Sequence, residues 1–190
     1  MRFLSICIAL TVALASPALA HTGVAQTNSF ASGIAHPLYG LDHILAMIVV
    51  GLWSVLAGGR AIWVWPMAFV TTMLAGFAAA TLGLQVPFVE PAIWSSIIIL
   101  GLLVSLAVKA PVWMGAVITG FFAFFHGHVH GTEVTAAGLI PYAAGFALAT
   151  AGLHATGIGL GLWAERRIGN LALRAMGGLA VLGGIALIAG

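Results

Sequence analysis

Charged side chains are scarce in this chain, and their scarcity indicates its class. Asp, Glu, Lys and Arg together make up 5% of the 190 residues, whereas hydrophobic residues make up 62%. The mean hydropathy of +1.17 is typical of helical membrane proteins and excludes an ordinary soluble domain. The formal charge of +2 comes from scattered residues that form no basic patch, so we expect no nucleic-acid partner.

Cysteine is scarce, and the motifs of several enzyme classes are absent from the sequence. Cys7 is the single cysteine, which excludes an intrachain disulfide and a metal site built from several thiolates. The sequence contains no G-x-x-x-x-G-K-[ST] motif, so the chain does not hydrolyse ATP with a P-loop. It also lacks H-E-x-x-H, and no serine or cysteine nucleophile stands beside its histidines.

Residues 1–20 have the three parts of a secretory signal peptide. Arg2 is followed by an apolar run over 3–14, and Ala-Leu-Ala at 18–20 matches the small-residue cleavage pattern. We therefore expect a mature chain of residues 21–190, organised as a single polytopic transmembrane domain. Its first residue would be His21, whose free amine and imidazole could chelate a metal ion. The alternatives are an uncleaved first helix, and a His21 that merely follows the cleavage site.

Six apolar segments follow the signal peptide, and each is long enough, or nearly so, for a helix that crosses a bilayer. A crossing helix needs about 20 residues. The sequence thus predicts an all-α integral membrane protein with about six transmembrane helices. We expect these helices within residues 36–57, 61–84, 92–108, 111–125, 134–163 and 170–189.

Positive charges predict how this domain is oriented. A cleaved signal peptide leaves the mature N-terminus outside, and the connections then alternate between the two sides of the membrane. Arg60, Lys109 and the pair Arg166 and Arg167 all fall on the inner side, as the positive-inside rule requires. We therefore expect both termini to lie outside.

The first polar cluster is the segment HPLYGLDH at 36–43. His36 and His43 are seven residues apart, so one continuous helix would place them on the same face. Asp42 would lie about 100° around that helix. The predicted topology puts this cluster at the outer end of the first helix.

The second polar cluster is the segment FHGHVHGTE at 125–133, predicted to lie at the same outer side. If the backbone stays helical, His126, His130 and Glu133 follow i, i+4, i+7 spacing and share a face. Alternatively, Gly127 and Gly131 unwind the segment and make a loop of ligands.

Imidazole and carboxylate donors without thiolate suit Ni²⁺, Co²⁺, Zn²⁺ or Cu²⁺. Ionisable groups within a membrane domain are costly, at about 2.5–3.5 kcal/mol on insertion scales for Asp, Lys or Arg, so they usually mark a site or a path. The candidate metal ligands from the two clusters are His36, Asp42, His43, His126, His130 and Glu133.

Three further residues are candidates for capturing or relaying a metal ion. Glu90 is the sole charge of its outer connection, and is either a solvated acid or part of the metal entrance. His128 would point away from the helical face of the second cluster. His154 lies deep in the fifth segment, and is either a core histidine between helices or an inner relay.

The sequence resembles the HupE/UreJ family of membrane proteins, which is associated with hydrogenase and urease accessory genes. The segments HPLYGLDHILAM, FHGHVHGTE and GLHATGIG carry the resemblance, together with His-Thr-Gly directly after the predicted cleavage site. The resemblance implies a nickel or cobalt permease whose metal residues are the six cluster residues above. It also implies a bacterial inner-membrane location, with the motifs facing the periplasm and nickel chaperones acting downstream.

The main hypothesis is therefore a permease that imports nickel, or cobalt, for metalloenzyme maturation such as that of hydrogenase. The ion would be cargo, with no permanently bound cofactor, and the chain would work alone or as a homo-oligomer. One alternative is an intramembrane metal-dependent hydrolase, because three histidines and an acid can hold Zn²⁺ and activate water. The other is a metal sensor or anchor that transports nothing.

Overall fold

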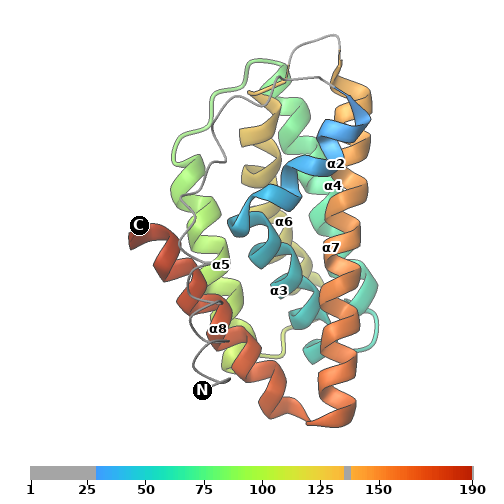
Figure 1. The fold of residues 1–190 in the computed structure, drawn as a ribbon, viewed down its shortest axis with the longest axis vertical. Helices are drawn as coiled ribbons and strands as arrows, with labels where there is room; N and C mark the ends of the chain where they lie inside the picture. Colours follow the sequence, from blue (N-terminus) through green and yellow to red (C-terminus); the bar gives the residue numbers. More distant parts are fainter. Residues whose placement is uncertain (1–28, 135–137, 190) are drawn as a thin grey trace, which may run out of the picture.

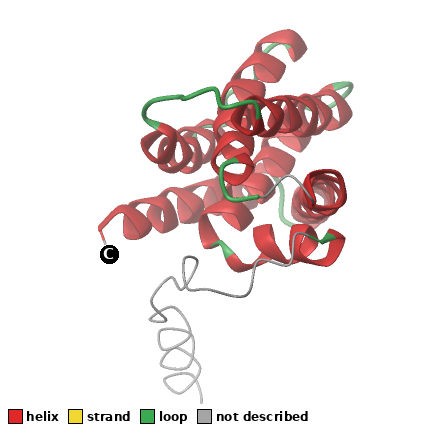
Figure 2. Ribbon diagram, turned by 90° about the horizontal axis from the view of Figure 1, so that it is seen from above, coloured by secondary structure: helices red, strands yellow, loops and turns green. Residues whose placement is uncertain are grey.

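A computed structural model of the chain describes residues 29–134 and 138–189, and every regular element in these ranges is an α-helix. Figure 1 shows the helices packed side by side along a common long direction, with α2 lying across it. Viewed along that direction, the helices are joined by loops and turns at their ends (Figure 2). The helices are α2 (Phe30–Tyr39), α3 (Leu41–Ala57), α4 (Ala61–Thr81), α5 (Val89–Ser105), α6 (Val112–Gly131), α7 (Leu139–Arg167) and α8 (Asn170–Ala189).

The predicted class, an all-helical membrane protein with several crossings, agrees with this architecture. Within residues 29–134 and 138–189, four helices are long and apolar enough to cross a bilayer, namely α4, α6, α7 and α8. The bent pair α2 and α3 qualifies when its helices are taken together, and α5 is a shorter apolar helix. The number of six crossings and their orientation stay predictions. The predicted signal peptide and His21 lie outside the described residues.

The first predicted helix, 36–57, is wrong as a single helix. The chain forms α2 and α3 instead, whose axes differ by 85°. Gly40 lies between them in an extended conformation (φ −91°, ψ 113°), and its carbonyl accepts the first hydrogen bond of α3 from Ile44. His36 and His43 consequently belong to different helices and do not share a helical face.

Glycines allow several pairs of helices to pack closely. A Cβ on Gly76 would lie 2.1 Å from the Phe124 carbonyl oxygen, so the backbones of α4 and α6 touch there. Gly157 of α7 meets Ile48 of α3 in the same way, and Gly177 of α8 meets α5. At these glycine contacts the helix backbones touch with no large side chain between them.

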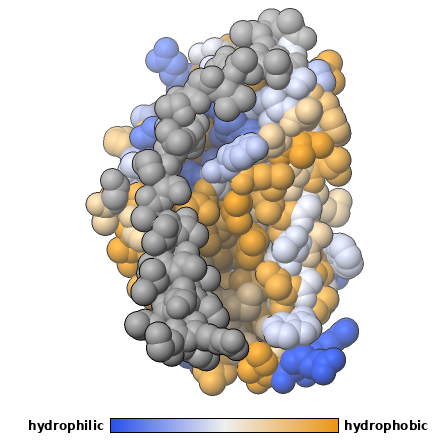
Figure 3. Space-filling view, in the orientation of Figure 1, coloured by the Kyte–Doolittle hydropathy of each residue, from blue (hydrophilic) through white to orange (hydrophobic). Residues whose placement is uncertain are grey.

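The outer surface of the bundle is mainly apolar along its length. Figure 3 shows hydrophobic colour over most of the middle of the visible face, with hydrophilic colour toward its ends. Large apolar side chains such as Trp63, Trp113 and Leu179 are more than half exposed. A surface of this kind suits contact with lipid, because burying it in hydrocarbon removes it from water.

Candidate metal-ion site

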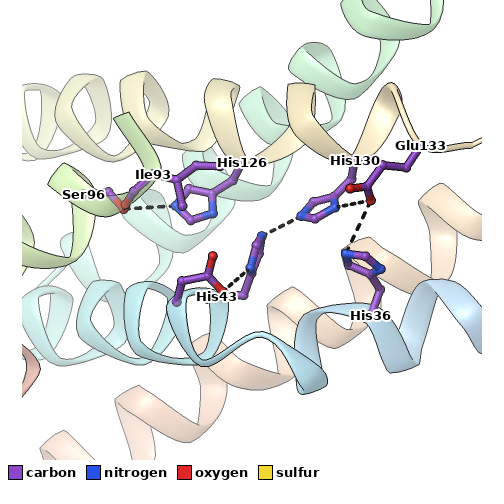
Figure 4. Close-up of polar contacts among 8 residues, drawn as sticks. His36, His43, Ile93, Ser96, His126, His130 and Glu133 are labelled. Carbon is purple, nitrogen blue, oxygen red and sulfur yellow. Dashed lines mark hydrogen bonds and ion pairs between the residues drawn. The ribbon is translucent and has the colours of Figure 1, made fainter. Parts of the chain in front are cut away.

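Three potential ligand residues converge where α2 and α6 end. His36 comes from the last turn of α2, His130 from the last turn of α6, and Glu133 from the turn that follows α6. Glu133 Oε2 lies 3.2 Å from His130 Nδ1 and 3.7 Å from His36 Nε2 (Figure 4). One ligand atom from each residue lies within 4.8 Å of the others, so small rotations would let all three bind one metal ion.

The inner side of His130 faces a second histidine, His43, in the first turn of α3. The two Nε2 atoms are 2.6 Å apart, although the residues are 87 positions apart in the sequence. His43 Nδ1 contacts Asp42 Oδ1 at 2.9 Å, and the His43 backbone N–H donates to the same oxygen at 2.8 Å. A continuous row of polar side chains therefore leads from Glu133 through His130 and His43 to Asp42, toward the interior of the bundle.

The two carboxylates favour one tautomer for each of these imidazoles. Asp42 and Glu133 accept hydrogen bonds from the Nδ1–H groups, so the Nε2 atoms of His43 and His130 are left to contact one another. This short contact needs a hydrogen between the two nitrogens, and a bound metal ion would take the place of that hydrogen. Carboxylates that orient imidazoles in this way are common partners of metal-ligating histidines.

Gly40 is required by the positions of these side chains. A Cβ at this position would lie 2.6 Å from Asp42 Oδ1 and 2.9 Å from His43 Nδ1. The absence of a side chain thus leaves room for the contact between Asp42 and His43. The same glycine ends α2 and turns the chain, so it serves both the fold and the site.

His126 lies one helical turn before His130 on the same face of α6, and its ring centroid is 5.0 Å from that of His43. Its Nε2 atom contacts Ser96 Oγ of α5 at 3.0 Å. Sequence reasoning missed Ser96. A polar residue within an otherwise apolar segment was the available signal.

The helical alternative for the second cluster is the correct one. α6 continues to Gly131, so Gly127 and Gly131 do not unwind the segment into a loop. Their missing side chains instead let α6 approach the backbone of α4 at Met73 and Phe77. The histidines of this cluster are therefore held on a packed helix, with Glu133 just beyond its end.

The three candidates for capturing or relaying a metal ion lie apart from this cluster. His128 points to a different side of α6, where its Nε2 contacts the Leu84 carbonyl oxygen at 2.7 Å. Glu90 is exposed in the first turn of α5. His154 is buried in α7 with its ring 5.0 Å from that of Phe69, deeper in the bundle than the cluster.

The charge balance around the cluster favours a cation. In the part of the chain that the structure describes, the close ionic contacts of Asp42 and Glu133 are made with histidines, which are neutral unless protonated, and not with lysine or arginine. These two half-buried carboxylates therefore have no permanent cation within ion-pair distance among the described residues. A divalent ion bound there would neutralise them.

Comparisons with known proteins agree with these motifs. The family described as HupE / UreJ protein matches residues 8–187. The chain is 43% identical to Protein HupE of Rhizobium leguminosarum bv. viciae over 180 residues, which cover 94% of each chain. No solved structure matches. On the extent of both matches, the chain belongs to the HupE/UreJ family.

Proposed function

We propose that this chain is a membrane permease that carries a divalent transition-metal ion, nickel or cobalt, toward the enzymes that need it. The observation that supports this most is the convergence of His36, His130 and Glu133 at one end of an apolar bundle. Ligands drawn from separate helices form a site only in the folded protein. Membership of a family associated with hydrogenase and urease accessory genes supports the same proposal.

The arrangement suits entry of an ion better than permanent storage. His130 Nδ1 contacts Glu133 and its Nε2 contacts His43, so this one side chain lies between the entrance group and the next histidine. An ion could leave the first position by exchanging ligands with the second. Asp42 would act mainly by orienting His43, because its oxygen contacts both the ring and the backbone of that residue.

The proposed direction is inward from the periplasm across the bacterial inner membrane. A divalent cation gains about 4.6 kcal/mol per 100 mV of membrane potential, from about 2.3 kcal/mol per elementary charge. Since about 1.4 kcal/mol corresponds to a tenfold change, the potential alone would support about a thousandfold accumulation. No nucleotide-driven step is needed for this import.

Uptake by purified protein in proteoliposomes tests the proposal directly. We expect ⁶³Ni²⁺ influx at low micromolar metal when the vesicle interior is negative, and competition by Co²⁺. Glu133→Gln should lose influx, because it removes the charge that faces His36 and His130. The matched control is His128→Gln, a buried histidine of the same helix that contacts a backbone carbonyl instead.

Influx equal to that of protein-free vesicles would contradict a permease. If the purified protein then kept tightly bound metal, a sensor or a metal-dependent hydrolase would replace it. Influx that survives in Glu133→Gln would instead contradict the proposed entry position.

A further inference from the structure

His154 has a surrounding that an ordinary core histidine does not have. It is 1% exposed, and neither of its ring nitrogens has a hydrogen-bond partner among the described residues. Buried polar atoms in folded proteins are nearly always hydrogen-bonded, so each exception needs an explanation. A structural role as a bonded bridge between helices does not account for this side chain.

His126 offers a similar unpaired atom on the neighbouring helix α6. The hydroxyl of Ser96 donates to the Ile93 carbonyl oxygen at 2.6 Å, so its oxygen is left to accept from His126 Nε2–H at 3.0 Å (Figure 4). This tautomer places a lone pair on Nδ1, and Nδ1 has no hydrogen-bond partner within residues 29–134 and 138–189. His126 is fully buried.

The two imidazoles meet the same part of the interior. Phe69 of α4 contacts both, with ring centroids 5.7 Å from His126 and 5.0 Å from His154. The two histidines are also close enough to interact electrostatically. Phe69 therefore marks an interior region that α4, α6 and α7 share.

Two more potential donors face this region from the same helices. Thr150 lies one turn before His154 on α7, and Met73 lies one turn after Phe69 on α4. The Thr150 hydroxyl contacts the Met73 sulfur at 3.6 Å, and both side chains are fully buried. Imidazole, thioether and hydroxyl groups thus gather in a part of the bundle that holds no carboxylate among the contacts described.

We propose that His126 and His154 form a second, inner binding position for the transported metal ion, with Met73 and Thr150 beside it. This inference rests on the permease function proposed above. Unpaired imidazole nitrogens and a thioether favour borderline or soft ions such as Ni²⁺, Co²⁺ or Cu²⁺ over Mg²⁺ and Ca²⁺. The inner position would therefore add selectivity after the carboxylate-containing entrance.

The order of the two positions follows from the contacts. His126 touches His43 on one side and Phe69 on the other, and Phe69 in turn touches His154. An ion leaving His43 would meet the Nδ1 lone pair of His126 before it meets His154. Its hydration shell would by then be largely replaced, and the unpaired imidazole nitrogens of His126 and His154 make no hydrogen bond that must first be broken.

The proposed inner position predicts that a substitution of His154 affects metal influx and protein stability differently. His154→Leu removes two buried nitrogens that have no hydrogen-bond partner and replaces the imidazole with an apolar side chain of similar size. The bundle should therefore be as stable as the wild type or more stable. Metal influx should nevertheless fall at least tenfold. A merely structural histidine would behave in the opposite way, with a lowered Tm and unaltered transport per folded molecule.

The experiment compares wild type, His154→Leu and His36→Gln, with His128→Gln as the control. Equilibrium binding of ⁶³Ni²⁺ to detergent-purified protein, proteoliposome influx and Tm are measured for each. We expect His154→Leu to bind one ion fewer per chain and to keep its Tm. His36→Gln should lose the other ion, and His128→Gln should match the wild type.

The outcomes distinguish the two proposals. Wild-type binding and influx in His154→Leu would overturn the inner position and leave the permease intact. Loss of both ions with a lowered Tm would also overturn it, because the role would then be structural. Absence of influx in the wild type itself would overturn the permease. If His154→Leu fails to fold, His154→Gln, which keeps a polar side chain without the imidazole, is judged by the same criteria.

Discussion

The two ends of the bundle carry their polar groups in opposite ways. At the end where α6 finishes, His36, His43, His130 and the two acids contact one another and are buried or half-buried. At the other end the basic residues are exposed and dispersed over several connections; they are Arg60, Lys109, Arg166 and Arg167.

Two buried tryptophans make hydrogen bonds inside the bundle near its basic end. Trp53 and Trp65 are fully buried, and their indole N–H groups donate to the carbonyls of Val108, between α5 and α6, and of Val112, the first residue of α6. Polar atoms are therefore satisfied there within the protein. Toward the histidine end, by contrast, buried ring nitrogens of His126 and His128 have no hydrogen-bond partner among the described residues. Among the described residues, the group of side chains that could hold a metal ion therefore lies at the histidine end.

The largest expected effect comes from His130→Gln. His130 contacts both Glu133 and His43, so its loss separates the entrance from the next position. We expect ⁶³Ni²⁺ influx to fall to the level of protein-free vesicles while membrane insertion is retained. Influx above half of the wild-type rate would mean that the two ends differ less in their importance for transport than their contacts indicate.

Asp42→Asn should have the next largest effect. The substitution keeps the size of the side chain but removes the charge that holds the His43 imidazole. Loss of a carboxylate that orients a metal-ligating histidine typically lowers metal affinity by about 10–100-fold. Binding titrations on purified protein measure this change, and an unaltered affinity would remove Asp42 from the site.

A smaller effect is expected for Gly40→Ala. The added methyl group would push Asp42 and His43 apart, because their side-chain atoms lie 2.6 and 2.9 Å from its position. Metal affinity should fall severalfold with little change in Tm, since those atoms belong to side chains that can move. Gly152→Ala is the control, because a methyl group there meets nothing within 4 Å. Equal affinity in both variants would show that the glycine is needed for the turn alone.

The smallest effect is expected at the basic end. Arg60→Gln removes an exposed charge far from the histidines, so metal affinity should stay within about twofold of the wild type. Its effect should instead be on the fraction of molecules inserted in the predicted orientation, because loop charge sets topology. Protease accessibility of the two termini in membrane vesicles measures that fraction. A large change in metal affinity would contradict the view that only the histidine end takes part in binding the ion.

Much of the fold was predictable because hydrophobic length and charge placement are local signals. The apolar segments, and the placement of both histidine clusters at one end, follow from them. The 85° turn was missed, although Pro37 and Gly40 stand in the sequence. Pro37 is accommodated inside α2, whereas Gly40 breaks the helix where Asp42 and His43 need room. That need exists only in the folded protein.

The sequence named candidate site residues, but it did not specify how their side chains would contact one another. The i, i+4 relation of His126 and His130 survives because α6 reaches Gly131. The approach of His36 to Glu133 depends on how α2 lies across the bundle, which no spacing in the sequence specifies. Ser96 was missed for the same reason, since its contact with His126 is made between separate helices.

The position of α2 across the bundle has a thermodynamic consequence. An ion held by His36, His130 and Glu133 would join segments almost a hundred residues apart, so it would bind the folded chain and not the unfolded one. Such a ligand raises the free energy of unfolding by about 2.7 kcal/mol at a concentration of 100 times its Kd. The folded population would then rise with the metal supply, which makes the stability of the protein itself a measure of how much cargo is available.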